Sequence, residues 1–188
     1  MRLAAATSRQ VLAALLAACA AAPAAAADYT LDPTHTTVHI ELDAPGGLST
    51  QRARFNKIEG RLAFDRAARS GQVDVTVQAA SLTSGAPTLD AVLRGPAVLD
   101  AEAHPTLQFS SSAFRFDGDR LIAVEGTLTL NGRASPVSLK ATRFDCYTSP
   151  LFRREVCGGD FEARIERAAF GIGEGSVRLI VQVEALRQ

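Results

Sequence analysis

Apolar and polar residues alternate with a period of two along most of the chain, which is the pattern of a β-strand with one dry and one wet face. Four segments show it most clearly: 37–42, 71–79, 121–130 and 176–186. In the last of these, Val177 and Val181 share one face and Arg178 lies on the other. Shorter runs of the same kind occur at 58–64, 107–109, 114–116, 137–139 and 161–165. The pattern predicts roughly nine or ten short strands.

Turn-forming residues separate these runs. Asn131-Gly132 and Asp117-Gly118-Asp119 lie between alternating segments, as in tight hairpins whose turn positions tolerate positive φ. Pro45-Gly46-Gly47 and Arg69-Ser70-Gly71 predict two further turns. Because such short connections force sequential strands to run antiparallel, we expect an antiparallel sheet.

One segment, 87–103, follows a helical rather than a strand pattern. Leu89, Val92 and Leu93 recur at helix-like spacing, and Gly95-Pro96 interrupts the run. We expect a short helix, a kink and a second helical turn that ends before His104-Pro105.

Side-chain size bears on the choice between a β-sandwich and a β-barrel, which give the same alternation. The chain has no Trp, aromatic residues make up 6% of it, and the inward faces are mainly Val, Leu, Ala and Gly. Barrels of about eight strands are just wide enough to be filled or to hold one small ligand. The small side chains favour such a barrel with free space inside, and a filled sandwich is the alternative.

The N-terminus has the three parts of a secretory signal. Arg2 and Arg9 are basic, 11–18 is a short apolar run, and Ala25-Ala26-Ala27 is a small-residue cleavage pattern. We therefore expect a signal peptide at 1–27, one domain at 28–188, and a periplasmic or secreted protein. The alternative is a lipoprotein anchored through Cys19, because the residues at 16–19 resemble a lipobox.

The number and position of the charges argue against nucleic-acid binding, against binding to an anionic membrane surface and against a membrane-spanning barrel. Basic and acidic residues number 20 each, and without Arg2 and Arg9 the balance is 18 basic to 20 acidic. A nearly neutral chain lacks the electrostatic footprint of a protein that binds nucleic acid or an anionic membrane surface. We also expect no membrane-spanning barrel, because the outward faces carry charges where lipid would require apolar residues, namely Glu41, Asp74, Glu125, Arg178 and Glu184.

Cys146 and Cys157 are the two cysteines outside the signal region. In an exported chain such a pair predicts one structural disulfide, here closing a hairpin-like segment. A redox or metal pair is the weaker alternative, because the spacing is not C-x-x-C and no histidine lies near in sequence.

The sequence contains residues of the types found in catalytic and metal sites, but they do not form a recognisable motif. His35, His39 and His104 are expected to be solvated or capping imidazoles rather than metal ligands. No G-x-S-x-G or H-E-x-x-H motif occurs. We therefore expect no metal site, no catalytic cofactor and no enzyme activity.

The remaining polar features are expected to lie in solvent. We interpret four acids near loops as solvated surface groups: Asp65, Asp90, Asp100 and Glu102. Gly171-Ile172-Gly173-Glu174-Gly175 predicts a loop at the rim, since a strand follows it rather than a helix. Arg153-Arg154 predicts a solvated polar loop tip between the cysteines, with an anion site as the alternative.

Several motifs together resemble the YceI-like, polyisoprenoid-binding family. They run in order through residues 28–185: YTLDPTHT at 29–36, IEGRLAFD at 58–65, Asp90 with Leu93 and Leu99, HPTLQFSS at 104–111, VEGTLTLNG at 124–132 and IERAAFGI at 165–172. The chain departs from the family in having Leu89 where the family has arginine before Asp90.

The resemblance implies a lipocalin-like extended antiparallel β-barrel with a helical segment over one opening, often in a homodimer. It also implies an isoprenoid chain, a polyprenyl compound or a quinone tail, bound in an apolar interior. The lining residues we predict are Val38, Ile40, Phe64, Val75, Val77, Leu93, Leu107, Phe109, Val124, Leu128, Val181 and Val183. Two alternatives remain, an enzyme acting on a lipid or quinone and a structural β-module with a filled core.

Overall fold

Successive strands pair with each other, and the last strand returns to the first. The computed structural model describes residues 26–43 and 45–188. Its strands are β1 (Ala27–Leu31), β2 (Thr37–Asp43), β3 (Thr50–Phe55), β4 (Ile58–Asp65), β5 (Ser70–Gln78), β6 (Leu82–Thr83), β7 (Thr106–Asp117), β8 (Arg120–Leu130), β9 (Arg133–Ser149), β10 (Arg154–Glu166) and β11 (Ser176–Arg187). The one α-helix of the described residues is α1 (Pro87–Arg94), and short 3-10 segments occur at Pro45–Gly47, Ala79–Ser81 and Arg167–Phe170.

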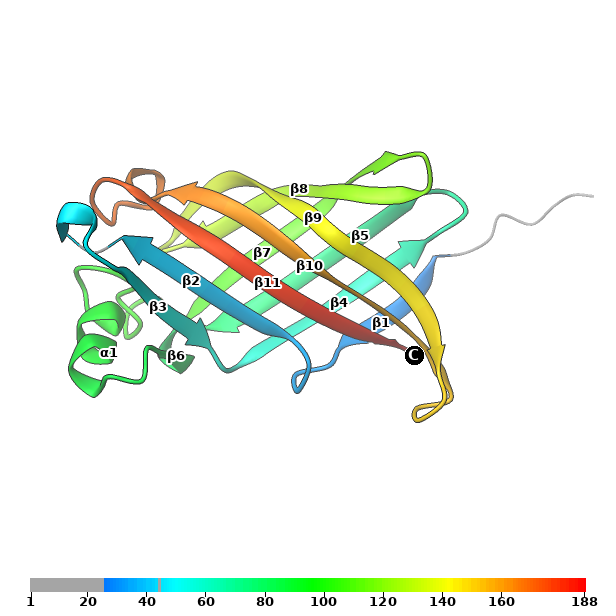
Figure 1. Cartoon of the computed structure of the whole chain (residues 1–188), viewed down its shortest axis with the longest axis horizontal. Coiled ribbons are helices and arrows are strands. Elements are labelled where there is room, and N and C mark those ends of the chain that lie inside the picture. Colours follow the sequence, from blue (N-terminus) through cyan, green and yellow to red (C-terminus); the bar gives the residue numbers. More distant parts are fainter. Residues whose placement is uncertain (1–25, 44) are drawn as a thin grey trace, which may run out of the picture.

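Eight strands close the barrel in the order β1-β4-β5-β7-β8-β9-β10-β11, and β11 pairs back to β1. All the pairings are antiparallel, as the short turns predict. The expectation of an all-β antiparallel barrel of about eight strands with one short helix is therefore confirmed (Figure 1).

The three strands outside that ring are continuations of barrel strands across short breaks. β2 continues β1, because both pair along one edge of β11 (Thr30 opposite Leu186, Val38 opposite Val181). In the same way β3 continues into β4, because β3 pairs with β2 and β4 pairs with β1. β5 continues into β6, because β5 pairs with β4 and β6 pairs with β3. The breaks at 56–57 and 79–81 meet, since the Asn56 amide donates to the Ser81 carbonyl at 3.3 Å. A line of breaks therefore crosses three neighbouring strands and divides the barrel along its length.

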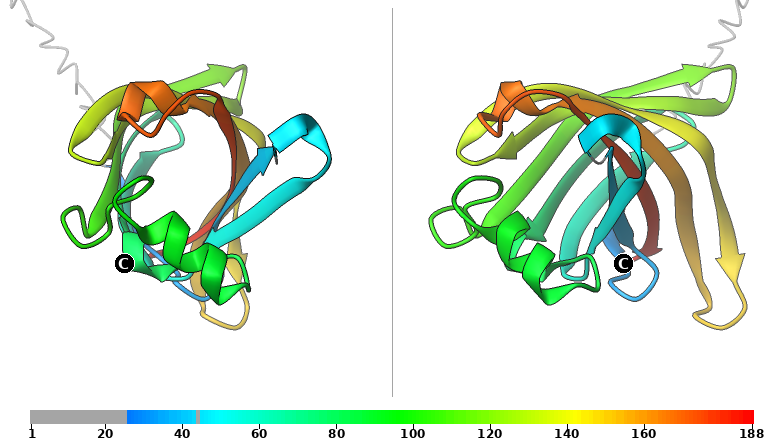
Figure 2. Two further views of the ribbon diagram at one scale, coloured as in Figure 1. Left: turned by 90° about the vertical axis from the view of Figure 1, so that its left-hand side faces the viewer. Right: turned by 60° about the vertical axis from the view of Figure 1, so that its left-hand side comes forward.

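The two ends of the barrel carry different structures (Figures 1 and 2). At the α1 end lie α1, the β2–β3 turn and the loop between β10 and β11. At the opposite end, called here the hairpin end, lie the C-terminus and the β9–β10 hairpin, which runs beyond the other strands.

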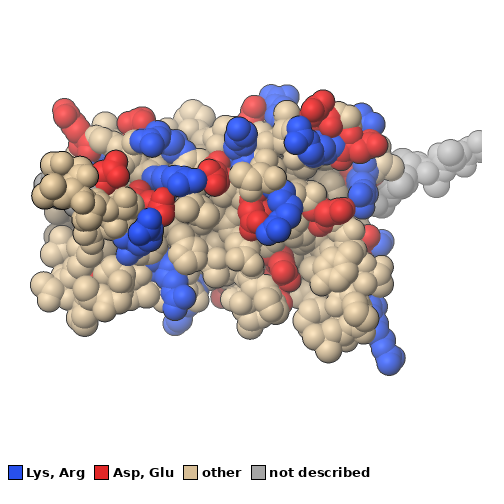
Figure 3. Space-filling model, viewed as in Figure 1, with Lys and Arg blue, Asp and Glu red and all other residues tan. Residues whose placement is uncertain are grey.

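Outward-facing charges pair across the strands. Glu41 on β2 accepts hydrogen bonds from Arg52 on β3 at 2.8 Å and from Arg178 on β11 at 3.3 Å. Arg178 also pairs with Glu162 on β10 at 2.9 Å. Figure 3 shows acidic and basic side chains interleaved over this face. Such exposed pairs contribute little stability individually, but they identify the wet face that the alternation predicts.

The turns predicted at Asn131-Gly132 and around Gly118 connect β8 to β9 and β7 to β8, as expected. Asn131 and Gly132 both have positive φ, 51° and 67°, which a two-residue hairpin of this kind requires. The segment 87–103 also follows the prediction. α1 ends at Arg94 before Gly95-Pro96, and turns follow, the last of them closed by the His104 amide, which donates to the Asp100 carbonyl at 2.7 Å.

The segments expected to direct export lie almost entirely outside the described residues, including Cys19. Of the predicted signal peptide only Ala26 and Ala27 are described, and Ala27 begins β1 opposite Phe64. None of the described helices has the length and apolar character needed to cross a bilayer.

Candidate functional site

The inward faces of the strands leave an apolar cavity of about 190 Å³ in the half of the barrel nearest α1. Every strand from β7 to β11, together with β2, β3, β5 and β6, contributes to it. The residues that line the cavity are Val38, Ile40, Leu42, Phe55, Val75, Val77, Leu82, Leu93, Val98, Leu99, Leu107, Gln108, Phe109, Leu128, Leu130, Val137, Leu139, Ile165, Arg167, Ile172, Val177, Leu179 and Val181. β1 and β4, beyond the line of breaks, contribute none.

Phenylalanine side chains fill the interior on the hairpin side. The rings of Phe64 and Phe144 lie 5.4 Å apart edge to face, and Phe144 continues to Phe161 at 6.2 Å. Phe114 and Phe116 lie 6.2 and 6.4 Å from Phe64. The composition suggested that small side chains line the whole interior. The structure shows that they line only part of it. Small aliphatic residues surround the cavity at the α1 end, and a phenylalanine cluster lies toward the other end.

Two glycines on inward-facing positions make room for aromatic rings. A Cβ on Gly126 would lie 2.4 Å from the Ser110 carbonyl oxygen and 2.6 Å from the Phe109 ring. A Cβ on Gly71 would lie 2.9 Å from the Phe114 ring. Glycine at these positions lets each ring lie against the neighbouring backbone, which sets how far the phenylalanines reach into the barrel.

α1 and the turns after it lie across one side of the opening at the α1 end (Figure 2). The helix begins with Pro87, whose fixed φ suits a first helical position, and ends where Gly95 precedes Pro96. Leu93 faces the cavity and is 9% exposed, whereas its neighbour Val92 is 58% exposed. Val98 and Leu99 also line the cavity from the turns. The segment from Pro87 to Leu99 is called the lid below.

Polar contacts hold the lid to the barrel. The Asp90 carboxylate accepts hydrogen bonds from the Thr83 hydroxyl at 2.7 Å and from the Ser84 amide and hydroxyl at 2.6 Å. Arg94 donates to the carbonyl of Leu82. On the other side the Asn131 amide donates to the Val98 carbonyl at 2.7 Å.

The prediction for Asp90 was wrong. Asp90 was expected to be a solvated surface acid, but its residue is 7% exposed and it is the hydrogen-bonding centre of the lid. The Ser84 hydrogen bonds, followed by that of Thr83, hold the pKa of Asp90 below its usual value, so the carboxylate stays charged and accepting.

Polar residues are few among those that line the cavity. Only Gln108 and Arg167 are polar, and two nitrogens of the Arg167 guanidinium already donate to the Ile172 carbonyl, at 3.1 and 2.8 Å. A space with such walls can hold hydrocarbon by excluding it from water.

Most of the predicted lining residues meet at this cavity. Nine face it: Val38, Ile40, Val75, Val77, Leu93, Leu107, Phe109, Leu128 and Val181. The other three do not. Phe64 belongs to the phenylalanine cluster, Val124 packs in a small group with Leu121 and Phe161, and Val183 lies among these residues. Contact of any of them with a ligand stays a prediction.

The lining residues that the sequence did not single out are of two kinds. Strand residues such as Leu130, Leu139 and Leu179 continue the predicted inward faces, so extending each alternating run would have found them. Leu82 lies in the two-residue strand β6, Val98 in the turns after α1 and Ile172 in the loop between β10 and β11, where no run is long enough for periodicity to mark the inward side.

The histidines do not assemble a metal site in the part of the chain that the structure describes. His35 Nδ1 lies 2.7 Å from Asp32 Oδ2 in the break between β1 and β2. No group of three or more potential metal ligands occurs among residues 26–43 and 45–188. The expectations of no metal and no catalysis stay predictions.

Comparison with known proteins gives one consistent result. Residues 29–185 match the family described as "YceI-like domain". A UPF0312 protein of Pseudomonas aeruginosa is 32% identical over 171 residues, which cover 87% of this chain and 88% of that protein.

Solved structures share the fold at lower identity. The crystal structure of BcnA from Burkholderia cenocepacia is similar with a TM-score of 0.66 and 21% identity, covering 84% of this chain and 99% of that one. A polyisoprenoid binding domain from Saccharophagus degradans, described as implicated in plant cell wall breakdown, is similar with a TM-score of 0.64 and 12% identity, covering 85% and 98%.

Proposed function

The chain belongs to the YceI-like family, and we propose that it is an exported protein that holds an isoprenoid chain in the apolar cavity under the lid. The ligand would be a polyprenyl compound or the tail of a prenyl quinone, kept for storage or transport in the cell envelope. The observation that carries the proposal is the cavity of about 190 Å³ with almost wholly hydrocarbon walls.

The chemistry of the cavity favours a carrier over an enzyme. Acid–base or nucleophilic catalysis needs titratable groups that converge on the reacting atom. The polar lining residues are one amide, Gln108, and one guanidinium, Arg167, and no carboxyl, imidazole or thiol group belongs to the lining. Binding would instead come from apolar burial, about 0.8 kcal/mol for each buried CH₂ group.

The size of the cavity limits what enters without rearrangement. An apolar cavity of about 150 Å³ holds one benzene molecule. The space under the lid therefore receives the end of an isoprenoid tail, and a longer tail requires the lid to shift or the tail to run out at the α1 end. The relative described as a polyisoprenoid binding domain supports the same ligand class.

Export and assembly are parts of the same proposal. The signal pattern at 1–27 and the disulfide Cys146–Cys157 support an oxidising compartment. A homodimer, which the family resemblance implies, would be detected by light scattering of the purified protein.

Native mass spectrometry of protein purified from its own host without detergent tests the function. We expect an adduct with the mass of an isoprenoid lipid, and uptake of a prenyl quinone by the delipidated protein. Val181→Trp, which fills the cavity, should abolish uptake, whereas Gln182→Trp on the outward face of the same strand should not. Bare protein mass with no quinone uptake, or uptake unaffected by Val181→Trp, would overturn the proposal.

A further inference from the structure

The β9–β10 hairpin projects from the barrel as a two-stranded arm. β9 pairs with β8 only as far as Lys140, and β10 pairs with β11 only from Val156 onwards. From Val156 onwards β10 lies between β9 and β11, so only the last two pairs, Thr148 with Glu155 and Ser149 with Arg154, stand clear of the barrel sheet. Figures 1 and 2 show the hairpin extending past the other strands at this end.

The end of this arm exposes large apolar side chains. Leu151 is 81% exposed, Tyr147 58% and Phe152 40%. Only two other large hydrophobic residues of the described chain are comparably exposed, Leu48 and Val92, and both lie at the α1 end. A cluster of exposed apolar side chains costs solubility, and such clusters mark interaction sites. The sequence predicted a polar loop here, so the apolar character of the tip is a finding of the structure.

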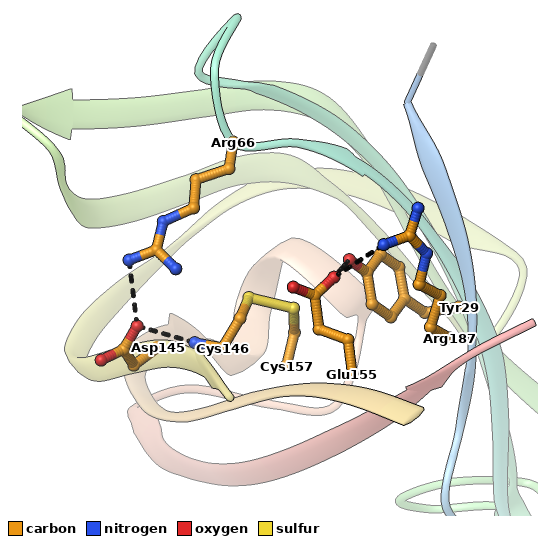
Figure 4. Close-up of a disulfide and its surroundings, with 7 residues drawn as sticks. All are labelled: Tyr29, Arg66, Asp145, Cys146, Glu155, Cys157 and Arg187. Carbon is orange, nitrogen blue, oxygen red and sulfur yellow. Dashed lines mark hydrogen bonds and ion pairs between the residues drawn. A yellow bond between two sulfur atoms is a disulfide. The ribbon is translucent and has the colours of Figure 1, made fainter. Parts of the chain in front are cut away.

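The chain as a whole is nearly neutral, which predicted no binding to an anionic membrane surface, but the charges around the tip leave the tip itself cationic. Arg153 and Arg154 follow Phe152 directly, and neither takes part in an ion pair within residues 26–43 and 45–188. The acids nearby are paired with other partners. Asp145 pairs with Arg66 at 3.2 Å, and Glu155 lies 3.5 Å from Arg187 (Figure 4).

The arm is held rigidly at its base. The disulfide joins Cys146 and Cys157, which lie directly opposite each other on β9 and β10. The Tyr29 hydroxyl of β1 donates to Glu155, and burial together with this hydrogen bond raises the pKa of Tyr29 to about 12. At the turn the Arg153 amide donates to the Ser149 carbonyl at 2.8 Å. A tip fixed in this way loses little conformational entropy on binding.

We propose that the hairpin tip, defined as residues 147–154, docks on an anionic lipid bilayer. Leu151 and Phe152 enter the boundary between head groups and acyl chains, Tyr147 lies at the head-group level, and Arg153 and Arg154 contact lipid phosphates. This is the arrangement of interfacial anchors, in which apolar burial and attraction to anionic lipid act together.

A bilayer fits the tip better than a protein partner does. A stable protein interface buries about 800 Å² on each side, which requires a broad face. The tip is instead the narrow end of two strands. With the tip on the bilayer, the lid at the opposite, α1 end faces away from it.

Vesicle flotation of the purified protein tests this docking. We expect binding to vesicles that contain phosphatidylglycerol and little binding to pure phosphatidylcholine. The double variant Arg153→Ala, Arg154→Ala should lower the partition coefficient on the order of 30-fold, from about 1 kcal/mol for each basic residue near the surface. Leu151→Ser with Phe152→Ser should lower it at least as far. The matched control is Leu48→Ser, an equally exposed leucine at the other end, which should bind as wild type does.

Three results would overturn the proposal: no flotation of the wild type with anionic vesicles, equal binding to both lipids, or tip variants that float like the wild type. The replaced side chains are exposed, so we expect the variants to melt at the same temperature as the wild type. Equal melting temperatures would exclude unfolding as the cause of weaker binding. If the wild type does not bind vesicles but self-associates in sedimentation velocity, and the tip variants lose that self-association, the tip contacts a second copy of the chain instead.

Discussion

Asp90 links the lid to the barrel through one carboxylate. Its oxygens accept from Thr83 and from both the amide and the hydroxyl of Ser84, in a residue that is 7% exposed. The sequence showed an acid on a short amphipathic helix, which in most proteins is solvated. Burial arises only because α1 folds back onto β6, and no local pattern encodes that contact.

We predict that Asp90→Asn loosens the lid. An asparagine can keep its amide oxygen toward the two Ser84 donors, but its nitrogen then faces the Thr83 hydroxyl, which now donates to a carboxylate oxygen, and the negative charge that strengthens these hydrogen bonds is lost. The melting temperature should fall by roughly 3–6 °C. Stopped-flow uptake of a prenyl quinone should become several-fold faster if the tail enters past a shifted lid, and unchanged if the tail enters at the open side of the α1 end. Glu102→Gln, an exposed acid of the following turns, serves as the control and should change neither measurement.

The contact between Asp32 and His35 predicts a pH optimum for stability. Burial raises the pKa of Asp32, but hydrogen bonds from Thr34 and His35 outweigh it and lower the pKa from 3.8 to about 2. The hydrogen bond and charge of Asp32 raise the pKa of His35 above 6.5. The Asp32 contribution, about 2 kcal/mol, is present above about pH 4 and lost as the pH falls toward 2. The His35 contribution is present below about pH 6.5 and lost as the pH rises through its raised pKa.

Thermal melting between pH 2 and pH 9 measures this dependence. The stability of the wild type relative to Asp32→Asn should be greatest between about pH 4 and 6.5 and should decline on both sides. Glu174→Gln, in the exposed loop between β10 and β11, should give a curve parallel to the wild type. A constant difference between wild type and Asp32→Asn across the range would show that this contact does not govern stability.

At the scale of elements, alternation was enough to locate the strands but not their breaks. Residues 37–42 and 176–186 differ from β2 and β11 by one residue at an end. By contrast, β3 (Thr50–Phe55) carries Gln51, Arg52 and Arg54 with only Ala53 and Phe55 inward, so it shows no apolar run. The two short runs at 107–109 and 114–116 are parts of one strand, β7, whose irregular register between Ser110 and Ala113 interrupts the alternation.

The disulfide between β9 and β10 is an element whose stability contribution can be measured. Cys146 and Cys157 are separated by 11 residues, and closing such a loop is worth about 3 kcal/mol by the loss of chain entropy in the unfolded state. Reduction, or the double variant Cys146→Ser, Cys157→Ser, should lower the melting temperature by roughly 6–12 °C. The barrel should keep its far-ultraviolet circular dichroism at 25 °C. Unchanged melting after complete reduction would show that the arm unfolds independently of the barrel.

At the scale of the whole molecule, the sequence predicted a barrel with internal space but not where the space lies. The mean aromatic content is low, yet five of the nine phenylalanines gather at the hairpin side and concentrate the empty volume under the lid. Phe64 illustrates the difficulty. It alternates inward like Val75, so periodicity gave it the same predicted role, and only the closure of the barrel brings it against Phe144. Position along the barrel axis depends on strand register, which period-two patterns do not contain.

Ligand binding should stabilise the whole barrel. A ligand at about 100 times its dissociation constant adds about 2.7 kcal/mol, which corresponds to a rise of roughly 5–11 °C in melting temperature for a domain of this size. We expect this rise when a prenyl quinone is added to the delipidated protein. The quinone head group alone, without an isoprenoid tail, should produce almost no rise in melting temperature. Equal shifts for both compounds would mean that the head group, and not the tail, is bound.

A crystal structure of the delipidated protein after loading with a prenyl quinone would show whether the cavity holds the tail. We expect continuous density for the tail between Val75, Leu107 and Val181, beneath Leu93 of the lid and ending against the phenylalanine cluster. Density for the quinone only on the outer surface, or side chains that close the space at full ligand occupancy, would contradict this expectation.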